Sequence, residues 1–200
     1  MAITPRIRLK RNFPGLESLA QTPESKWSHF LSRTAEINPF LSSQEYGVLY
    51  AAISPTCQNY ACRNVMMQLA MKERDVKYAL EKVYRKLEVH DAFSAVYTTL
   101  ENGLLDIGKI PGLRVEDIAS KLSELIPSEE KILDTMAELA MRYGEINYKS
   151  VAAILPLRVK TIKHYIGTIK SKLGFDNQAQ LAVAAYIRKH HTLPESVPTL

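Results

Sequence analysis

Residues 147–175 read NYKSVAAILPLRVKTIKHYIGTIKSKLGF, and this stretch decides the fold. In its second half, apolar residues recur at spacings of four, three and four, which predicts one buried stripe along a helix from about residue 160 to 173. The stripe consists of Ile162, Ile166, Ile169 and Leu173. The other face of the predicted helix has no acidic residue and carries Lys160, Thr161, Lys163, His164, Gly167, Thr168, Lys170 and Ser171.

A shorter helix is predicted just before this one. Asn147 can cap it, and the apolar residues Val151, Ile154 and Leu155 share one of its faces. The helix is expected to stop at Leu155, because Pro156 disfavours helical conformation in the residue before it. Two short helices joined by a tight turn, the second buried on one side and cationic on the other, fit the major groove of DNA.

Gly167 lies in the middle of the predicted groove-binding helix. Glycine inside a helix costs about 1 kcal/mol relative to alanine, so its presence here needs a reason. Either the helix approaches another surface closely at this point, or Gly167 faces a neighbouring helix or is merely tolerated.

Residues 149–187 resemble the LuxR/GerE family of helix-turn-helix domains, whose recognition helix and following turn have the pattern TVKxHxxxIxxKLGVxNRxEL. The matching residues are Thr161, Ile162, Lys163, Tyr165, Ile169, Lys172, Leu173, Gly174, Phe175, Asn177, Ala179 and Leu181. Tyr165 stands where the family usually has His, Ser150 where it usually has Glu, and Gly167 where several members have a longer side chain.

The resemblance implies DNA-contacting roles for several positions. Lys163, His164 and Gly167 occupy positions that commonly approach bases. Lys149, Lys160 and Thr161 occupy phosphate-contacting positions, and the last helix, residues 178–189, often forms the dimer interface. Thr168 and Lys170 complete the predicted DNA-binding set.

An earlier part of the chain repeats this pattern. Residues 41–53 align with 125–137 at an offset of 84, and residues 76–89 align with 162–175 at an offset of 86. Glu45 then falls on Glu129. Two lysines, Lys77 and Lys86, fall on Lys163 and Lys172. The upstream segment therefore also resembles the family, more distantly.

The exposed face of this first copy mixes charges of both signs. Arg74 and Lys77 are weaker DNA-binding candidates, because Glu73, Asp75 and Glu81 lie among them and carboxylates near phosphates reduce affinity. Glu81 can still accept a hydrogen bond from a cytosine amino group. We interpret this copy as a degenerate unit used for packing or pairing.

The sequence thus predicts an all-α chain of two tandem LuxR/GerE-like four-helix helix-turn-helix units, joined by a short acidic helical spacer and preceded by a basic N-terminal arm. The predicted segments are a basic arm and N-terminal helix (1–38), the degenerate unit (39–104), the acidic spacer (105–124), the DNA-binding domain (125–191) and a tail (192–200).

Basic residues gather near the two ends. Residues 145–200 hold eight Lys/Arg and three Asp/Glu, whereas residues 101–144 hold five and nine. A local basic block on a balanced chain is typical of a surface that binds polyanions. The N-terminal arm is a weaker candidate for backbone contacts through Arg6, Arg8, Lys10 and Arg11.

The predicted function is sequence-specific binding of double-stranded DNA by a bacterial-type transcription regulator, with residues 160–173 in the major groove. No catalytic set, metal-ligand spacing or phosphate loop is visible, so we expect no enzyme activity, metal or cofactor. No apolar run is long enough to span a membrane. Cys57 and Cys62 are the only cysteines, and reduced thiols would fit a cytoplasmic, nucleoid-associated protein.

Two alternative functions remain open. One is a sigma-factor-like partner of RNA polymerase, although no aromatic-rich promoter-melting helix precedes the spacer. The other is a protein-interaction adaptor that has lost DNA binding. Two modes of pairing also remain open: a homodimer through the C-terminal helix, or an intramolecular pseudo-dimer in which residues 92–100 pair with residues 178–189.

Overall fold

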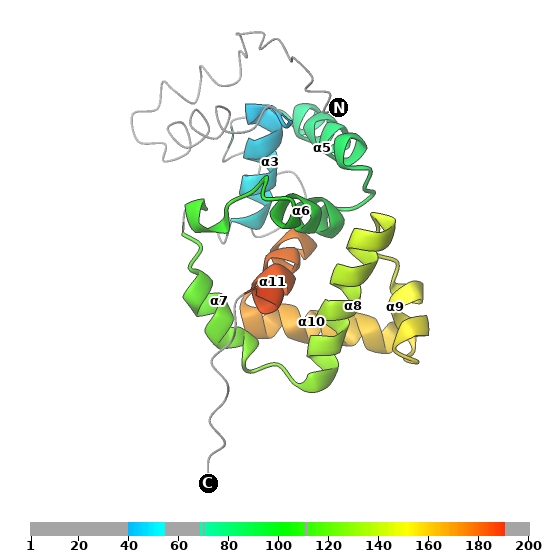
Figure 1. Cartoon of the computed structure of the whole chain (residues 1–200). Helices are drawn as coiled ribbons and strands as arrows, with labels where there is room; N and C mark the ends of the chain where they lie inside the picture. The colour runs from blue at the N-terminus through cyan, green and yellow to red at the C-terminus, as the bar shows by residue number, and fades with distance from the viewer. Residues whose placement is uncertain (1–39, 55–68, 70, 111, 191–200) are drawn as a thin grey trace, which may run out of the picture.

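The computed structural model describes residues 40–54, 69, 71–110 and 112–190, and all regular structure within these ranges is helical (Figure 1). The all-α prediction is therefore confirmed. The helices are α3 (Ser43–Ile53), α5 (Glu73–Leu87), α6 (Ala92–Glu101), the 3-10 helix η1 (Ile107–Lys109), α7 (Val115–Leu122), α8 (Pro127–Tyr143), α9 (Tyr148–Ile154), α10 (Val159–Leu173) and α11 (Gln178–His190). The predicted arm, with Arg6, Arg8, Lys10 and Arg11, and the tail 192–200 lie outside the described residues.

Helices α6 and α11 form the centre of the molecule. They pack along each other more extensively than any other pair of described helices. Residues 179–185 of α11 are all buried, as are residues 92–97 of α6. A helix that is apolar on nearly all sides must be enclosed by other elements, and α3, α7 and α8 also pack on α11. The alanines of α11 allow these neighbours to come close.

The predicted acidic spacer contains the expected short helix, α7, and this helix is part of the core. Ile118 and Leu122 are buried where α7 packs against α10 and α11. At the end of α10, the Lys121 Nζ donates a hydrogen bond to the carbonyl oxygen of Leu173 at 3.3 Å. The segment between the two halves therefore stabilises the second half rather than only connecting it.

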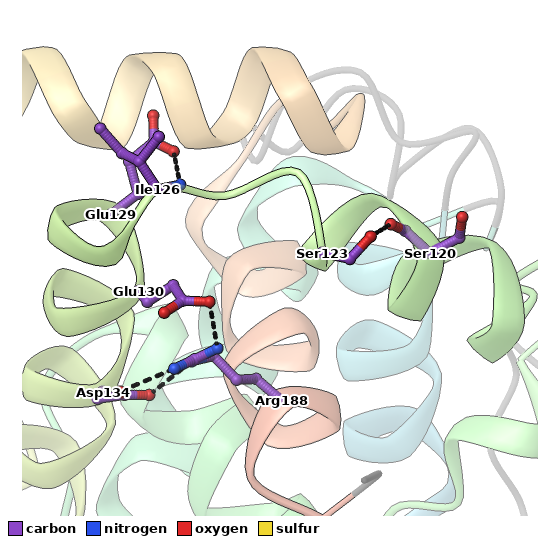
Figure 2. A network of polar contacts seen from close by, with 7 residues as sticks. All are labelled: Ser120, Ser123, Ile126, Glu129, Glu130, Asp134 and Arg188. Carbon is purple, nitrogen blue, oxygen red and sulfur yellow. Dashed lines mark hydrogen bonds and ion pairs between the residues drawn. The ribbon is translucent and has the colours of Figure 1, made fainter. Parts of the chain in front are cut away.

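The described parts of two halves of the chain, residues 40–101 and 125–190, repeat the same ion pair between a buried carboxylate and a partly exposed lysine. In the first half, the carboxylate of Glu45 accepts hydrogen bonds from the backbone N–H of Ser42 and from the Lys86 Nζ, both at 2.6 Å. In the second half, Glu129 accepts them from the N–H of Ile126 at 2.9 Å and from the Lys172 Nζ at 2.8 Å. Both carboxylates are buried. Figure 2 shows the bond between Ile126 and Glu129.

Further contacts repeat at the same offsets. Helices α5 and α10 each have fifteen residues. The side chain of Asp91 caps α6 by accepting from the N–H of Ser94 at 2.9 Å, and Asn177 accepts from the N–H of Gln180 at 3.0 Å at the start of α11. The offsets that align the two sequences therefore also align their structural contacts.

The two halves contact each other reciprocally. At the start of α6, Asp91 Oδ2 accepts from the N–H of Ile146, just beyond α8, at 2.7 Å. At the start of α11, Asn177 Nδ2 donates to the carbonyl of Ala52, near the end of α3, at 3.0 Å. Each half thus sets the start of its last helix against the end region of α3 or α8 in the other half.

Gly144 allows the two halves to approach closely. It adopts a left-handed conformation (φ 66°), and its carbonyl accepts from the N–H of His90 at 2.8 Å. A Cβ at this position would lie 2.4 Å from the carbonyl oxygen of Glu88, which is backbone and cannot move away easily. Any larger residue would force the second half away from the first.

The buried hydroxyl of Tyr46 should make the stability of the fold depend on pH in the alkaline range. Its hydroxyl is buried and has no hydrogen-bond partner among the described residues. Burial, with the nearby Tyr50 and Glu45, raises its pKa to about 12. The unfolded chain loses this proton near pH 10 and the folded chain does not, so stability should fall between about pH 10 and 12.

We expect Tyr46→Phe to leave stability at pH 7 unchanged or to raise it by about 1 kcal/mol, and to reduce the alkaline loss. Urea denaturation at pH 7 and pH 11 measures both effects. Tyr50→Phe is the matched control, because the Tyr50 hydroxyl accepts a hydrogen bond from the N–H of Asp106 at 3.3 Å and its removal should destabilise the fold. Equal losses in the two variants would contradict this account.

Candidate nucleic-acid interface

Helices α9 and α10 form the structural unit that the sequence predicts. The side chain of Asn147 accepts from the N–H of Lys149 at 2.9 Å and starts α9. The turn after α9 is closed by the N–H of Leu157, which donates to the carbonyl of Ala152 at 3.0 Å. Helix α10 then runs from Val159 to Leu173, one residue longer than predicted.

One detail of α9 differs from the expectation. Val151 is buried in the core. Ile154, expected to share its apolar face, is the last residue of a helix of only seven residues and is 52% exposed. The turn toward α10 therefore carries an exposed apolar side chain.

Helix α10 divides into the two predicted faces. Its apolar stripe is buried: Ile162, Ile166, Ile169 and Leu173. On the other face, Lys160, Lys163, His164, Gly167 and Ser171 are exposed, whereas Thr161, Thr168 and Lys170 are half-buried. Lys149, on α9, is also exposed. The structure thus places the predicted cations of the second half on the solvent side of two adjacent helices.

The predicted DNA-binding side chains of α9 and α10 differ in whether they already form hydrogen bonds within the protein. Lys170 Nζ donates to the carbonyl of Asp176 at 3.0 Å, and the Thr168 hydroxyl donates to the carbonyl of His164 at 3.2 Å. Lys149, Lys160 and Lys163 make no side-chain hydrogen bond or ion pair within the described part of the chain. These three cations therefore remain available to a ligand, and Lys170 less so.

Arg158 belongs to the same surface, although the helix pattern of the sequence did not predict it. It is exposed at the N-terminal boundary of α10, one residue before Val159. Like the three lysines, its side chain has no partner within the residues that the structure describes. Its position in the turn before a cationic helix could have signalled it.

Two cations of α11 are paired with acidic residues. Arg188, on α11, pairs with Glu130 at 2.8 Å and Asp134 at 3.0 Å, both on α8 (Figure 2). Lys189 pairs with Glu101 at 3.1 Å. Apart from Lys131 on α8, the cations of this half that have no carboxylate partner among the described residues lie on α9, α10 and the turn between them.

Gly167 lies on this surface with open space around it. A Cβ built there meets no atom within 4 Å. Among the described residues no helix packs against it, which leaves two of the three explanations: an approach by an external surface, or mere tolerance.

The equivalent surface of the first half, on α5, is balanced in charge. Lys77 pairs with Glu73 at 2.6 Å, and Arg74 lies 3.8 Å from Asp75. Tyr78 is 55% exposed, with the Lys82 Nζ 4.3 Å from the centre of its ring. Whereas α10 presents cations alone, α5 presents cations with their own counter-charges.

A separate groove of about 900 Å³ lies between α6, α8 and α11, lined by Tyr97, Met141, Arg142, Ala185 and Lys189 among others. Glu101, near this groove, accepts hydrogen bonds from Lys189 and His190. Burial alone would raise the pKa of Glu101, but hydrogen bonds from His190, Lys189 and Tyr97 outweigh it and lower the pKa below its ordinary value. The polar groups beside the groove are thus bonded to one another.

No protein-family model, curated protein or solved structure matches the chain. Within the described ranges, no group of three or more His, Cys, Asp or Glu side chains could hold a metal ion. Nor is any helix there long and apolar enough to cross a bilayer.

Proposed function

We propose that the chain is a transcription regulator that binds double-stranded DNA sequence-specifically, with α10 as its recognition helix. One observation carries the proposal: α10 buries an apolar stripe and turns an acid-free face to solvent, where Lys160 and Lys163 have no partner within the described residues. A helix of this kind, preceded by a short helix and a tight turn, suits the major groove.

In this proposal the second half, α8 to α11, is a LuxR/GerE-type helix-turn-helix unit and the first half is its degenerate copy. The order of helices and the repeated ion pairs support the assignment. A chain of this kind would be associated with the nucleoid.

The contacts to DNA divide into two groups. Lys163 and His164, in the first half of α10, would reach base edges. Lys149, Arg158 and Lys160 would contact phosphates, with Thr161 beside them, and these contacts fix the register of the helix without reading sequence. Thr168 and Lys170 are already engaged and would contribute less.

We further propose that one chain acts without a homodimer. The face of α11 through which a homodimer would form is covered by α6, and residues 179–185 are buried. The pair of α6 and α11 would then take the place of a dimer interface. Sedimentation at micromolar concentration should give one chain, and a stable two-chain species would count against this arrangement.

Selection of bound fragments from random DNA, followed by titration of the purified chain against the selected duplex, tests the proposed function. We expect selection to converge on a preferred site. If no fragment is enriched and the chain does not bind DNA in dilute buffer, it is no DNA-binding regulator, and the adaptor interpretation replaces this one.

The substitution Gly167→Ala distinguishes the two remaining explanations for Gly167, namely that α10 merely tolerates a glycine here or that DNA approaches the helix backbone closely. Because nothing within 4 Å meets the added Cβ, we expect the variant to be more stable than the parent by about 1 kcal/mol. If DNA approaches the backbone here, affinity for the selected duplex should nevertheless fall. Thermal melting and DNA titration measure the two effects. A more stable variant with unchanged affinity would show that Gly167 is only tolerated.

A further inference from the structure

We infer that α5 contacts the same duplex as α10, so that a single chain reads a two-part, non-palindromic DNA site. This inference rests on the proposed function and extends it to the first half of the chain. Three observations support it: the register of the two helices, their placement and the charges they expose.

The register of α5 matches that of α10 on both faces. At an offset of 86, the buried residues Val76, Leu80 and Val83 fall on Ile162, Ile166 and Ile169. The same offset puts Arg74 on Lys160, Lys77 on Lys163 and Tyr78 on His164. These three side chains of α5 are exposed, so core packing does not require them. Both helices thus present two cations and a hydrogen-bonding ring at equivalent outward positions.

The placement of α5 follows from the reciprocal contacts between the halves. They set the two halves against each other at the central pair of α6 and α11, and Figure 1 shows α5 and α10 on opposite sides of that pair. In dimeric helix-turn-helix proteins a two-fold axis sets the two recognition helices on neighbouring turns of one major groove. Here the two helices that correspond in sequence belong to one chain and flank its central helix pair.

The charges of α5 allow a weaker contact with different base preferences. The ion pairs of Lys77 with Glu73 and of Arg74 with Asp75 are exposed, and exposed pairs contribute little stability, so neither of these pairs holds its cation strongly away from a phosphate. Glu81 stands where α10 has Gly167 and has no partner among the described residues. A carboxylate at a base edge accepts from the cytosine amino group, so the two half-sites must differ.

A second copy of this chain would bind the α5 surface less favourably than a DNA duplex would. Antiparallel pairing of two α5 helices about Tyr78 would set Arg74 of one copy opposite Lys82 of the other. Like charges placed opposite each other disfavour that contact. A duplex, in contrast, offers phosphates to both cations.

The test compares three double variants of the full chain on the selected duplex over a range of salt concentrations. Arg74→Ala with Lys77→Ala changes α5, and Lys160→Ala with Lys163→Ala changes α10. Arg114→Ala with Lys131→Ala is the matched control, because it removes two exposed cations from the acidic part of the chain. Thermal melting checks that all three variants fold.

We expect the α5 variant to lower the slope of log affinity against log salt by about 1.8 and the control to change it little, since each lost phosphate contact lowers the slope by about 0.9. Stoichiometry should be one chain per duplex. If the α5 variant behaves as the control while the α10 variant loses affinity, this inference is wrong and the proposed function stands; α5 would then be a protein-docking surface or have no ligand. If the α10 variant also behaves as the control, both the inference about α5 and the proposed DNA-binding function are wrong.

Discussion

Replacing Lys163 with alanine is expected to lower the affinity of the chain for its selected duplex by about 1–3 kcal/mol, or roughly 5- to 150-fold. Lys163 is exposed on the acid-free face of α10 and has no side-chain partner within the described residues, so its loss should leave the fold intact. If it reads a base, the loss should be largest on the preferred site and smaller on unrelated DNA. Fluorescence anisotropy with both duplexes measures the difference.

Lys131→Ala is the control for this experiment. Lys131 is also an exposed lysine on a helix, but it lies on α8 among acidic residues. Its removal should change affinity for both duplexes little. If Lys163→Ala binds the preferred site as tightly as Lys131→Ala does, Lys163 has no base-reading role.

Lys172→Ala is expected to destabilise the folded chain by about 3 kcal/mol, the largest stability effect we expect from a single substitution. Glu129 is buried, and the Lys172 Nζ at 2.8 Å is its counter-charge. Removing one partner of a buried pair leaves the other charge uncompensated, which typically costs 3–5 kcal/mol. Lys172 is itself 29% exposed, so the lower end of that range applies. Urea denaturation at pH 7 measures the change.

Two variants test this explanation of the Lys172 effect. Lys189→Ala breaks a more exposed pair with Glu101 and should cost less than about 1 kcal/mol. Adding Glu129→Gln to Lys172→Ala removes the unpaired charge and should recover part of the loss. A Lys172→Ala variant no less stable than Lys189→Ala would show that the repeated ion pair contributes little.

Helix positions could be predicted well from the sequence because they depend on local spacing. The stripe from Ile162 to Leu173 fixed the helix and its buried face, and the same spacing at an offset of 86 located α5. The matched glutamates and lysines of the alignment form two ion pairs whose carboxylates are buried. The ion pairs and the buried stripes repeat because α5 and α10 bury equivalent faces in the two halves.

The distribution of free charge could not be predicted, because it depends on contacts between distant segments. The C-terminal excess of basic residues includes Lys172, Arg188 and Lys189, and each is paired with a carboxylate from an earlier helix. Arg158 was missed because it lies in the turn rather than on the helix face. Likewise, the burial of α7 against α10 and α11 depends on tertiary packing, so the segment looked like a spacer.

The most direct test of the central claim, that α10 presents its cations to a duplex, is a salt titration of the purified full chain against its selected DNA. With Lys149, Arg158, Lys160 and Lys163 each contacting a phosphate or base edge, we predict that log affinity falls linearly with log salt, with a slope of about −3 to −4 from these residues, to which the inferred contacts of α5 add about −1.8. No binding in dilute buffer, or binding whose strength does not depend on salt, would contradict the claim.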